Sequence, residues 1–209
     1  HQRAHPHTLM NFVALVILGY LLGSCPWGVW IVKLVRGEDI RKVGSGNIGA
    51  TNVWRMYGRW LGIPVVSLDL LKGFVPALLG VLLVSPLCGI AAGVAAMVGH
   101  WRPLFLKFAK GGKIVATGGG VFFGVAAWVS VVALIVWLLV FVLSRYASLA
   151  SIVAALSLPI TAFSFGYSPS VIVLSFGVMG GVLYLHRVNI ARLRNGTESR
   201  FSFRRTARA

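Results

Sequence analysis

The chain has 209 residues, of which 57% are hydrophobic and 11% are charged, and its mean hydropathy is +0.85. A soluble domain is about a quarter charged, so this composition excludes an ordinary soluble protein and indicates an all-α, polytopic membrane protein. The net charge of +16 does not indicate nucleic-acid binding, because the basic residues flank apolar runs, as they do in cytoplasmic loops of membrane proteins.

Apolar runs that approach the length of a membrane-spanning helix, about 20 residues, recur along the chain. Residues 9–32 carry no charge and predict the first span, residues 61–84 predict the second, and residues 86–101 predict a short third. Residues 146–186 contain no Asp, Glu, Lys or Arg, and the turn sequence GYSP at 166–169 divides them into two further spans.

The uncharged stretch 114–144 fits either one tilted helix or two short helices. Basic residues flank it, and if both flanks are cytoplasmic, the chain must cross the membrane an even number of times between them. We therefore expect two short helices that turn near residues 126–130, for a total of seven transmembrane helices. The first of the two is expected to begin unwound at TGGG, 117–120. The flanking basic residues are Lys107, Lys110, Lys113 and Arg145.

The basic residues also predict the orientation. Arg3 is the only one before the first span, whereas residues 33–59 and the tail are rich in lysine or arginine, which places the N-terminus outside and the C-terminus in the cytoplasm. We expect a leader or expression remnant at 1–8, a seven-helix membrane domain at 9–193 and a basic cytoplasmic tail at 194–209.

Polar residues gather in three clusters, at 37–59, at 99–117, and at 145–151 together with 186–192. In the expected topology all three lie on the cytoplasmic side of the membrane. This one-sided gathering predicts a site at the inner membrane surface.

The first cluster contains GSGNIGATN at 44–52. Its glycines let the backbone approach a ligand closely, and a short helix after it would present free N–H groups beside an arginine, which suits a phosphate. An ordinary connecting loop is the alternative. The candidate phosphate-binding residues are Ser45, Gly46, Asn47, Thr51, Asn52 and Arg55.

The second cluster contains KGGK at 110–113. It resembles half of a phosphate loop, but Lys113 is followed by Ile114, so the nucleotide-binding motif G-x-x-x-x-G-K-[ST] is absent. We expect Lys113, Gly111 and Gly112 to contact a phosphate, with lysines that merely mark a cytoplasmic turn as the alternative.

The third cluster offers Ser148 and Ser151, one helical turn apart, and His186 and Asn189, which share a helical face. Hydroxyl residues on membrane helices usually serve helix packing. Both that role and an interfacial cap at the end of the last span stay open here beside a functional role.

Several kinds of chemistry are missing from the sequence. No His, Cys, Asp or Glu group has metal-ligand spacing, and no G-x-S-x-G motif is present. Asp69 and Lys72 lie inside the second span, where an unpaired charge is costly, so we expect a mutual ion pair. Cys25 and Cys88 are interpreted as free thiols.

Taken in chain order, the segments match a known pattern: GSGNIGATN, DLLKG at 69–73, GHWRPLF at 99–105, KGGK, RYASLAS at 145–151 and HRVNIARL at 186–193. They resemble the bacterial PlsY family, the acyl-phosphate:glycerol-3-phosphate acyltransferases. The resemblance covers about residues 20–193, and the order of the segments makes it specific.

The resemblance implies a seven-helix enzyme of the bacterial inner membrane with its site facing the cytoplasm. It implies transfer of an acyl group from acyl phosphate to the 1-hydroxyl of glycerol 3-phosphate, giving lysophosphatidic acid and phosphate in phospholipid synthesis, with no metal or other cofactor. The expected partners are these two substrates and membrane lipid. The residues that carry over are Ser45, Thr51, Arg55, Lys113, Ser151, His186 and Asn189.

Three points stay open at this stage. The family usually has glycine where this chain has Ile114, and we expect a β-branched residue to forbid positive φ there, so loop geometry or rate suffers if the family needs that glycine. The attacking hydroxyl's proton is expected to pass to the donor phosphate, with His186 as the other candidate. A transporter for an organic phosphate is the alternative function, and a monomer is the simplest expectation for the oligomeric state.

Overall fold

The computed structural model describes residues 6–202, and that range is helical with no β-strand. Its α-helices and 3-10 helices follow one another along the chain with short connections. They are α1 (Pro6–Gly23), α2 (Trp27–Arg36), η1 (Ile40–Lys42), α3 (Ala50–Tyr57), α4 (Arg59–Leu83), α5 (Pro86–Trp101), η2 (Leu104–Leu106), α6 (Val115–Val125), α7 (Ala127–Ser144), α8 (Ala147–Ser164), α9 (Pro169–Leu185) and α10 (Arg187–Arg194).

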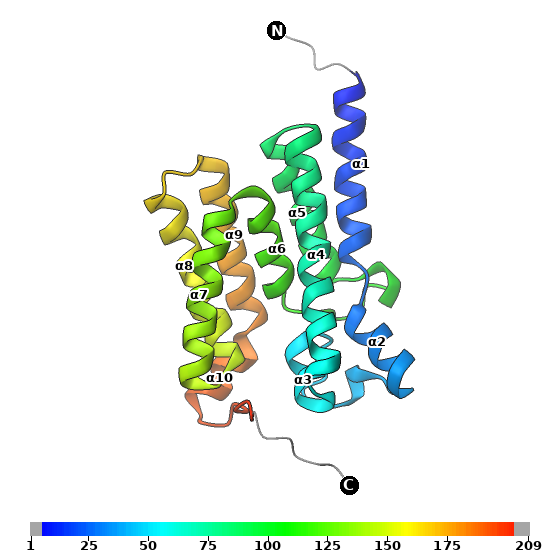
Figure 1. Cartoon of the computed structure of the whole chain (residues 1–209), viewed down its shortest axis with the longest axis vertical. Helices are drawn as coiled ribbons and strands as arrows, with labels where there is room; N and C mark the ends of the chain where they lie inside the picture. The colour runs from blue at the N-terminus through cyan, green and yellow to red at the C-terminus, as the bar shows by residue number, and fades with distance from the viewer. Residues whose placement is uncertain (1–5, 203–209) are drawn as a thin grey trace.

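The long helices stand side by side in two groups (Figure 1). In one group α1, α4 and α5 pack against one another, and in the other α8 packs against both α7 and α9. The short α6 contacts α4, α5, α7 and α9, so it joins the two groups. The short helices α2, α3 and α10 lie at one end of the bundle, the lower end in Figure 1, which we call the polar end.

Several of these helices are suited to a membrane. Among the described residues, four helical stretches are long and apolar enough to cross a bilayer, and a fifth is added if α9 and α10, which meet at 60°, count as one span. Large apolar side chains cover their outer faces, such as Leu139 at 59% exposed, Phe163 at 76% and Val173 at 70%. Lipid is the solvent in which such faces are stable, which agrees with the predicted all-helical membrane protein.

The run that predicted the first span, residues 9–32, contains a break. α1 ends at Gly23 and α2 begins at Trp27, with Pro26 as its N-cap. Proline has no N–H to donate and its ring clashes with a preceding helical turn, so the helix is interrupted here (Figure 1), although α1 and α2 together form one of the four apolar stretches, His7–Arg36. Because proline lies inside an uninterrupted apolar run, hydropathy alone does not reveal the break.

The stretch 114–144 forms two helices, as predicted, and they meet at Ala126. They are unequal: α7 has 18 residues, whereas α6 has 11 and is about 16 Å long at 1.5 Å per residue. The predicted unwinding at TGGG is wrong, because residues 117–120 are helical. Gly120 serves packing instead, because a Cβ there would lie 2.0 Å from the Leu70 carbonyl oxygen of α4, whereas a Cβ on Gly118 or Gly119 would meet nothing closer than 3.4 Å.

The charged pair inside the second span is confirmed. Lys72 Nζ lies 2.7 Å from Asp69 Oδ1, and both side chains are almost fully buried. The same ammonium donates to the backbone oxygen of Cys25 at 2.9 Å, and His100 Nδ1 lies 3.7 Å from the Asp69 carboxylate. The pair thus braces α4 against the α1–α2 break, whereas His100 of α5 lies beside it without a hydrogen bond from Nδ1. Cys25 and Cys88 are free thiols.

The predicted boundaries at the termini fall partly outside the described residues. Of the expected leader, residues 1–5 are not described, and Pro6 already begins α1. Of the expected tail at 194–209, residues 203–209 are not described. The described part of the tail folds back, because Phe201 is buried and packs against Trp54 and Phe141.

Candidate active site

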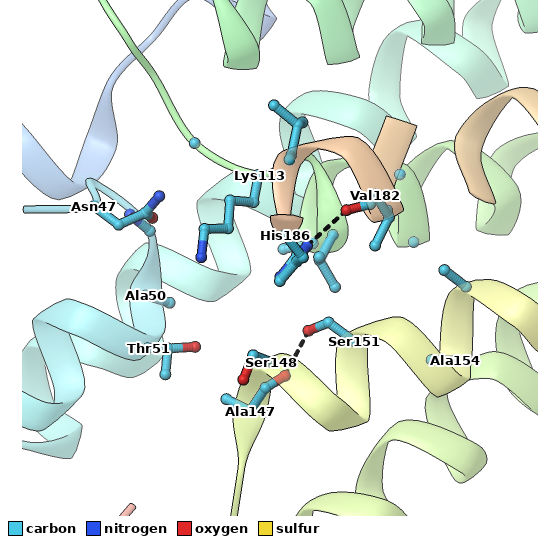
Figure 2. A pocket seen from close by; sticks show the side chains of 18 of the residues that line it. Asn47, Ala50, Thr51, Lys113, Ala147, Ser148, Ser151, Ala154, Val182 and His186 are labelled. Atoms are coloured by element: carbon cyan, nitrogen blue, oxygen red, sulfur yellow. Dashed lines mark hydrogen bonds between the residues drawn. The ribbon is translucent and has the colours of Figure 1, made fainter. Parts of the chain in front are cut away.

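A cavity of about 600 Å³ opens at the polar end of the bundle. Its polar wall comes from the loop before α3, from α3, from the segment before α6, from the start of α8 and from the α9–α10 junction. Three clusters that are distant in the sequence therefore meet there, and Figure 2 shows Thr51, Lys113, Ser148 and His186 around one space. The basic residues that line it are Arg55, Arg102, Lys110, Lys113, Arg187 and Arg192, and the acidic ones are Asp69 and Glu198.

The predicted site residues line this cavity, with two exceptions. Gly46 and Gly111 do not line it but shape its loops: Gly46 has φ +69°, and a Cβ on Gly111 would lie 2.1 Å from the His100 carbonyl oxygen. The residues in the wall are Ser45, Asn47, Thr51, Asn52, Arg55, Gly112, Lys113, Ser148, Ser151, His186 and Asn189.

Asn52 is the internal brace of the glycine-rich loop. Its Oδ1 accepts from the Ser45 backbone N–H at 3.0 Å, and its Nδ2 donates to the carbonyl oxygens of Val43 and Asn47. Because the carboxamide has only two N–H donors, both are already used. Both donors of Asn52 therefore hold the loop, and its contact with substrate stays a prediction.

The helix after this loop points one end at the cavity. No side chain caps the N-terminus of α3, and Ala50 and Thr51 of its first turn line the cavity, so the positive end of the helix dipole faces it. Arg55 follows one turn later, and its Nε is buried without a hydrogen-bond partner. Burial lowers the pKa of Arg55, with the charge of Glu198 acting in the opposite direction. The guanidinium stays protonated and available to an anion.

The KGGK segment is tied to the C-terminal end of α5. The N–H of Gly111 donates to the Trp101 carbonyl and that of Gly112 to the His100 carbonyl, each at 2.9 Å. The segment runs so close to α5 that a Cβ on Gly112 would lie 2.0 Å from His100 Nε2. Glycine is therefore required at position 112, and this contact fixes where Lys113 enters the cavity.

Lys113 is the start of a chain of hydrogen bonds across the cavity. Its Nζ donates to Asn189 Oδ1 at 2.5 Å. Asn189 Nδ2 and Ser148 Oγ both donate to Glu198 Oε1 at 2.7 Å. Burial lowers the pKa of Lys113 to about 8, and the Glu198 charge acts against that shift. One lysine, one amide, one carboxylate and one hydroxyl thus join four parts of the chain.

Glu198 was missed by the sequence analysis, which assigned its surroundings to a basic tail. A signal is present in the sequence: the residue is one of only four acids and lies three positions before Phe201. Gly196 has φ +68° and ends α10, so the chain turns back over the cavity. Phe201 then stabilises the turn, because its backbone N–H donates to the Arg145 carbonyl at 2.8 Å.

His186 lies one residue beyond the end of α9, and its ring is buried. Nδ1 donates to the Val182 carbonyl at 2.9 Å, which leaves Nε2 as the unprotonated nitrogen of the neutral ring. Burial first, and then the charge of Lys113, lower the pKa of His186 to about 4. The ring is therefore neutral near pH 7 and can accept a hydrogen bond from a hydroxyl.

Ser151 lines the cavity, but its hydroxyl already has partners. It donates to the Ala147 carbonyl at 2.7 Å (Figure 2) and accepts from Trp137 Nε1 at 3.1 Å. No histidine ring bonds to it among the described residues. The arrangement offers no activated serine nucleophile.

The cavity continues from this polar wall into an apolar part between α6, α7 and α8, which we call the apolar wing. Its side chains are Phe122, Phe123, Ala133, Leu134, Trp137, Leu138, Ala154, Ala155 and Leu158. Leu134 and Leu138 of α7 line the wing and are 46% and 47% exposed, so other parts of the chain do not cover the wing at this helix. The site can hold an anionic group and a hydrocarbon chain together.

The comparison with family models decides which proteins this site belongs with: the model described as Glycerol-3-phosphate acyltransferase matches residues 13–196. The chain belongs to the glycerol-3-phosphate acyltransferase family. Among its relatives, the glycerol-3-phosphate acyltransferases of Endomicrobium trichonymphae and Aquifex aeolicus are 44% and 45% identical, over 90% and 92% of this chain and 94% and 100% of theirs.

Solved structures of family members agree with the fold. A crystal structure of PlsY, described as an integral membrane glycerol 3-phosphate acyltransferase in its glycerol 3-phosphate form, matches with a TM-score of 0.88 and 44% identity over 92% of this chain and 96% of that one. The lysophosphatidic acid form matches with a TM-score of 0.84 at 42% identity, with the same coverage of 92% and 96%. The resemblance found in the sequence is thereby confirmed, and this family member is a multi-pass membrane protein.

Proposed function

We propose that this acyltransferase moves a fatty acyl group from acyl phosphate to the 1-hydroxyl of glycerol 3-phosphate, forming lysophosphatidic acid and phosphate in phospholipid synthesis. The observation that carries the proposal is the union, in one cavity, of a cationic wall and an apolar wing. Both substrates bear a phosphate, and one bears a hydrocarbon chain. The ester bond forms as the acyl–phosphate bond breaks, and phosphate leaves.

The cationic wall acts as the phosphate clamp. Arg55 offers a buried N–H without a partner, Lys113 offers an ammonium, and the uncapped start of α3 offers backbone N–H groups. Charge-assisted hydrogen bonds from such groups are strong and directional. Fixing two anions beside each other contributes to rate by proximity, and an acyl phosphate is activated enough to need no serine or cysteine nucleophile.

The proton of the attacking hydroxyl passes to the departing phosphate in this proposal. A general base works best when its pKa lies near the working pH, whereas the pKa of His186 is held at about 4. The free Nε2 of His186 orients the hydroxyl by accepting its hydrogen bond, and Asn189 keeps Lys113 in place. No group of three or more His, Cys, Asp or Glu able to hold a metal occurs between residues 6 and 202, and the proposed chemistry uses no metal and no cofactor.

The apolar wing holds the acyl chain of the donor, which enters sideways from the membrane. Ser151 and Ser148 lie at the polar end of the wing on α8, and Ala154 lies one turn further along the same helix. The reacting carbonyl is therefore placed near Ser148 and Ser151. The methylene chain extends past Ala154 toward Leu158.

We also infer seven membrane crossings, made by α1 and by α4 to α9, in the bacterial inner membrane. A helix as short as α6 is accommodated by local thinning of the bilayer. The start of α1 and helix α10 lie at opposite ends of the bundle (Figure 1), as an odd number of crossings requires. The basic polar end is assigned to the cytoplasm, and the protein is taken to work as a monomer.

One assay tests the proposal. Purified protein in lipid nanodiscs is given palmitoyl phosphate and labelled glycerol 3-phosphate, and lysophosphatidic acid is the expected product. Uptake of glycerol 3-phosphate into proteoliposomes without product would favour the transporter alternative. That alternative fits poorly with a cavity whose polar groups gather at one end of the helices, because transporters bind near the membrane midplane.

A further inference from the structure

The expectation that an isoleucine forbids positive φ at position 114 is wrong, because Ile114 adopts that backbone conformation. It is the N-cap of α6, with φ 59° and ψ 0°, in the left-handed region. A β-branched residue is strained there, because its side chain crowds the backbone. Such strain persists only when the surrounding structure enforces it. The question is what holds Ile114 in place and what its position controls.

The side chain of Ile114 is buried against α9. It is 8% exposed and belongs to the main apolar core with Val178 and Val182 of that helix. Directly opposite lies Gly181, where a Cβ would come within 3.1 Å of Ile114 Cδ1. The side chain of Ile114 thus packs into the space on α9 that the absence of a side chain at Gly181 leaves open.

The same helix has two other glycines that supply an internal comparison. A Cβ on Gly177 or on Gly180 would meet nothing within 4 Å. Of the three, Gly181 is the one where an added Cβ would have a close neighbour, Ile114 Cδ1 at 3.1 Å. Glycine weakens a helix relative to alanine. Packing against Ile114 explains why glycine occupies position 181, and Gly177 and Gly180 have no such contact.

This contact lies between two parts of the candidate active site. Lys113 precedes Ile114 directly, and Val182, which follows Gly181, provides the carbonyl that holds His186 Nδ1 at 2.9 Å. α9 then leads into α10, where Asn189 accepts from Lys113. A shift of Ile114 relative to α9 therefore changes the separation of Lys113 from Asn189.

We propose that Ile114 is a positioning residue, whose side chain, seated over Gly181, holds the left-handed turn that aims Lys113 at Asn189. The consequence for catalysis rests on the proposed role of Lys113 as a phosphate clamp. The contact between Ile114 and Gly181 does not depend on that role. Ile114 and Gly181 touch no substrate in this scheme and act through the lysine.

The test is a double-mutant cycle between the two positions. Gly181→Ala in the natural background presses on Ile114 Cδ1, and we expect kcat/KM to fall about tenfold, since small misplacements of a reacting group are costly. Ile114→Val removes only Cδ1, and we expect a change of less than about twofold. In the I114V background, Gly181→Ala is then expected to cost less than about twofold, because the clashing atom is gone. Gly180→Ala is the matched control and is expected to leave kcat/KM unchanged.

A second readout follows Lys113 itself. Labelling of its amine by an acylating reagent, resolved by peptide mass spectrometry across pH, reports its pKa, which burial holds at about 8. The charged and titratable groups that act on it are Glu198, Arg192, Lys110, Arg55 and His186. Neither Gly181→Ala nor Ile114→Gly changes any of them. We expect both variants to shift the Lys113 labelling curve toward higher pH, as the amine gains water, and Gly180→Ala to leave it in place.

The outcomes distinguish the positioning contact between Ile114 and Gly181 from the phosphate-clamp role of Lys113. Equal effects of Gly181→Ala in the natural and I114V backgrounds, or no effect in either, would overturn it. So would a Lys113 labelling curve that is unchanged in both Gly181→Ala and Ile114→Gly. If Lys113→Ala remains active while Gly181→Ala and Ile114→Gly still shift the Lys113 labelling curve, the phosphate clamp fails and the positioning contact stands. Should Ile114→Gly fail to fold, the cycle built on Ile114→Val alone decides.

Discussion

Lys113 Nζ lies 2.5 Å from Asn189 Oδ1 and thereby joins the segment before α6 to α10, 76 residues further along the chain. The amide has a second partner, because its Nδ2 donates to Glu198. Asn189 therefore holds a cation and a carboxylate apart while contacting both. It sets the direction of the ammonium that we assign to substrate phosphate.

Asn189→Ala is expected to reduce kcat/KM for glycerol 3-phosphate by about 10- to 100-fold, because a hydrogen bond to a charged group is worth about 1.5–3 kcal/mol. Steady-state assays with purified protein measure this. Asn195→Ala is the matched control, since Asn195 is exposed and lies outside the cavity wall. Equal activities of the two variants would refute the role of Asn189.

Glu198→Ala is expected to destabilise the fold by about 1–3 kcal/mol, because Ser148 and Asn189 both lose their acceptor inside the protein. Glu198→Gln keeps one oxygen acceptor and is expected to lose less stability than Glu198→Ala. Thermal unfolding in detergent measures which of the two variants is less stable. Glu38→Gln controls for the loss of a charge, since Glu38 is exposed and outside the cavity wall. A Glu198→Ala variant as stable as the natural protein would contradict the network.

The pH dependence of kcat/KM is expected to show a falling limb above about pH 8, the pKa of Lys113. The sign follows from the charge: the protonated amine binds phosphate, and protonation is lost as pH rises through that value. The substrate phosphate, with a second pKa of about 6, does not titrate in this range. Arginine stays charged, so Lys113→Arg is expected to move the limb to higher pH. The same limb in both proteins would assign it to another group.

Ala154→Leu is expected to narrow the apolar wing and to change the acyl preference. Ala154 is 7% exposed and lines the cavity, so added methylene groups occupy space that we assign to the donor chain. Relative to the natural protein, kcat/KM is expected to fall about tenfold for palmitoyl phosphate and by less for an octanoyl donor. The ratio of the two substrates provides the internal control. An unchanged ratio would place the acyl chain elsewhere.

Much of the site could be predicted from the sequence, because polar residues are conspicuous in so apolar a chain. Motif order indicated Arg55, Lys113, His186 and Asn189 as site residues, and these side chains line one cavity. The ion pair of Asp69 and Lys72 followed from the cost of a charge inside a membrane.

The rest depended on tertiary contacts. Glu198 enters the site only because Gly196 ends α10 and Phe201 fastens the returning chain, and no periodicity encodes that turn. The glycines of TGGG look like a flexible segment, yet they are helical, and the close approach of α4 accounts for the last of them, Gly120. Ile114 showed a mismatch between residue type and loop geometry, but its partner Gly181 becomes visible only when α9 is in place.

The central claim is that one cavity with a cationic wall binds the substrate phosphate. The most direct test measures glycerol 3-phosphate binding and acyl transfer in the same protein preparations. We expect Lys113→Ala and Arg55→Ala, both folded, to lose more than about 90% of lysophosphatidic acid formation and to bind glycerol 3-phosphate at least about tenfold more weakly by calorimetry. Lys107→Ala and Arg59→Ala, which remove exposed charges outside the cavity wall, are expected to match the natural protein. Near-normal binding and turnover in both site variants would contradict the account.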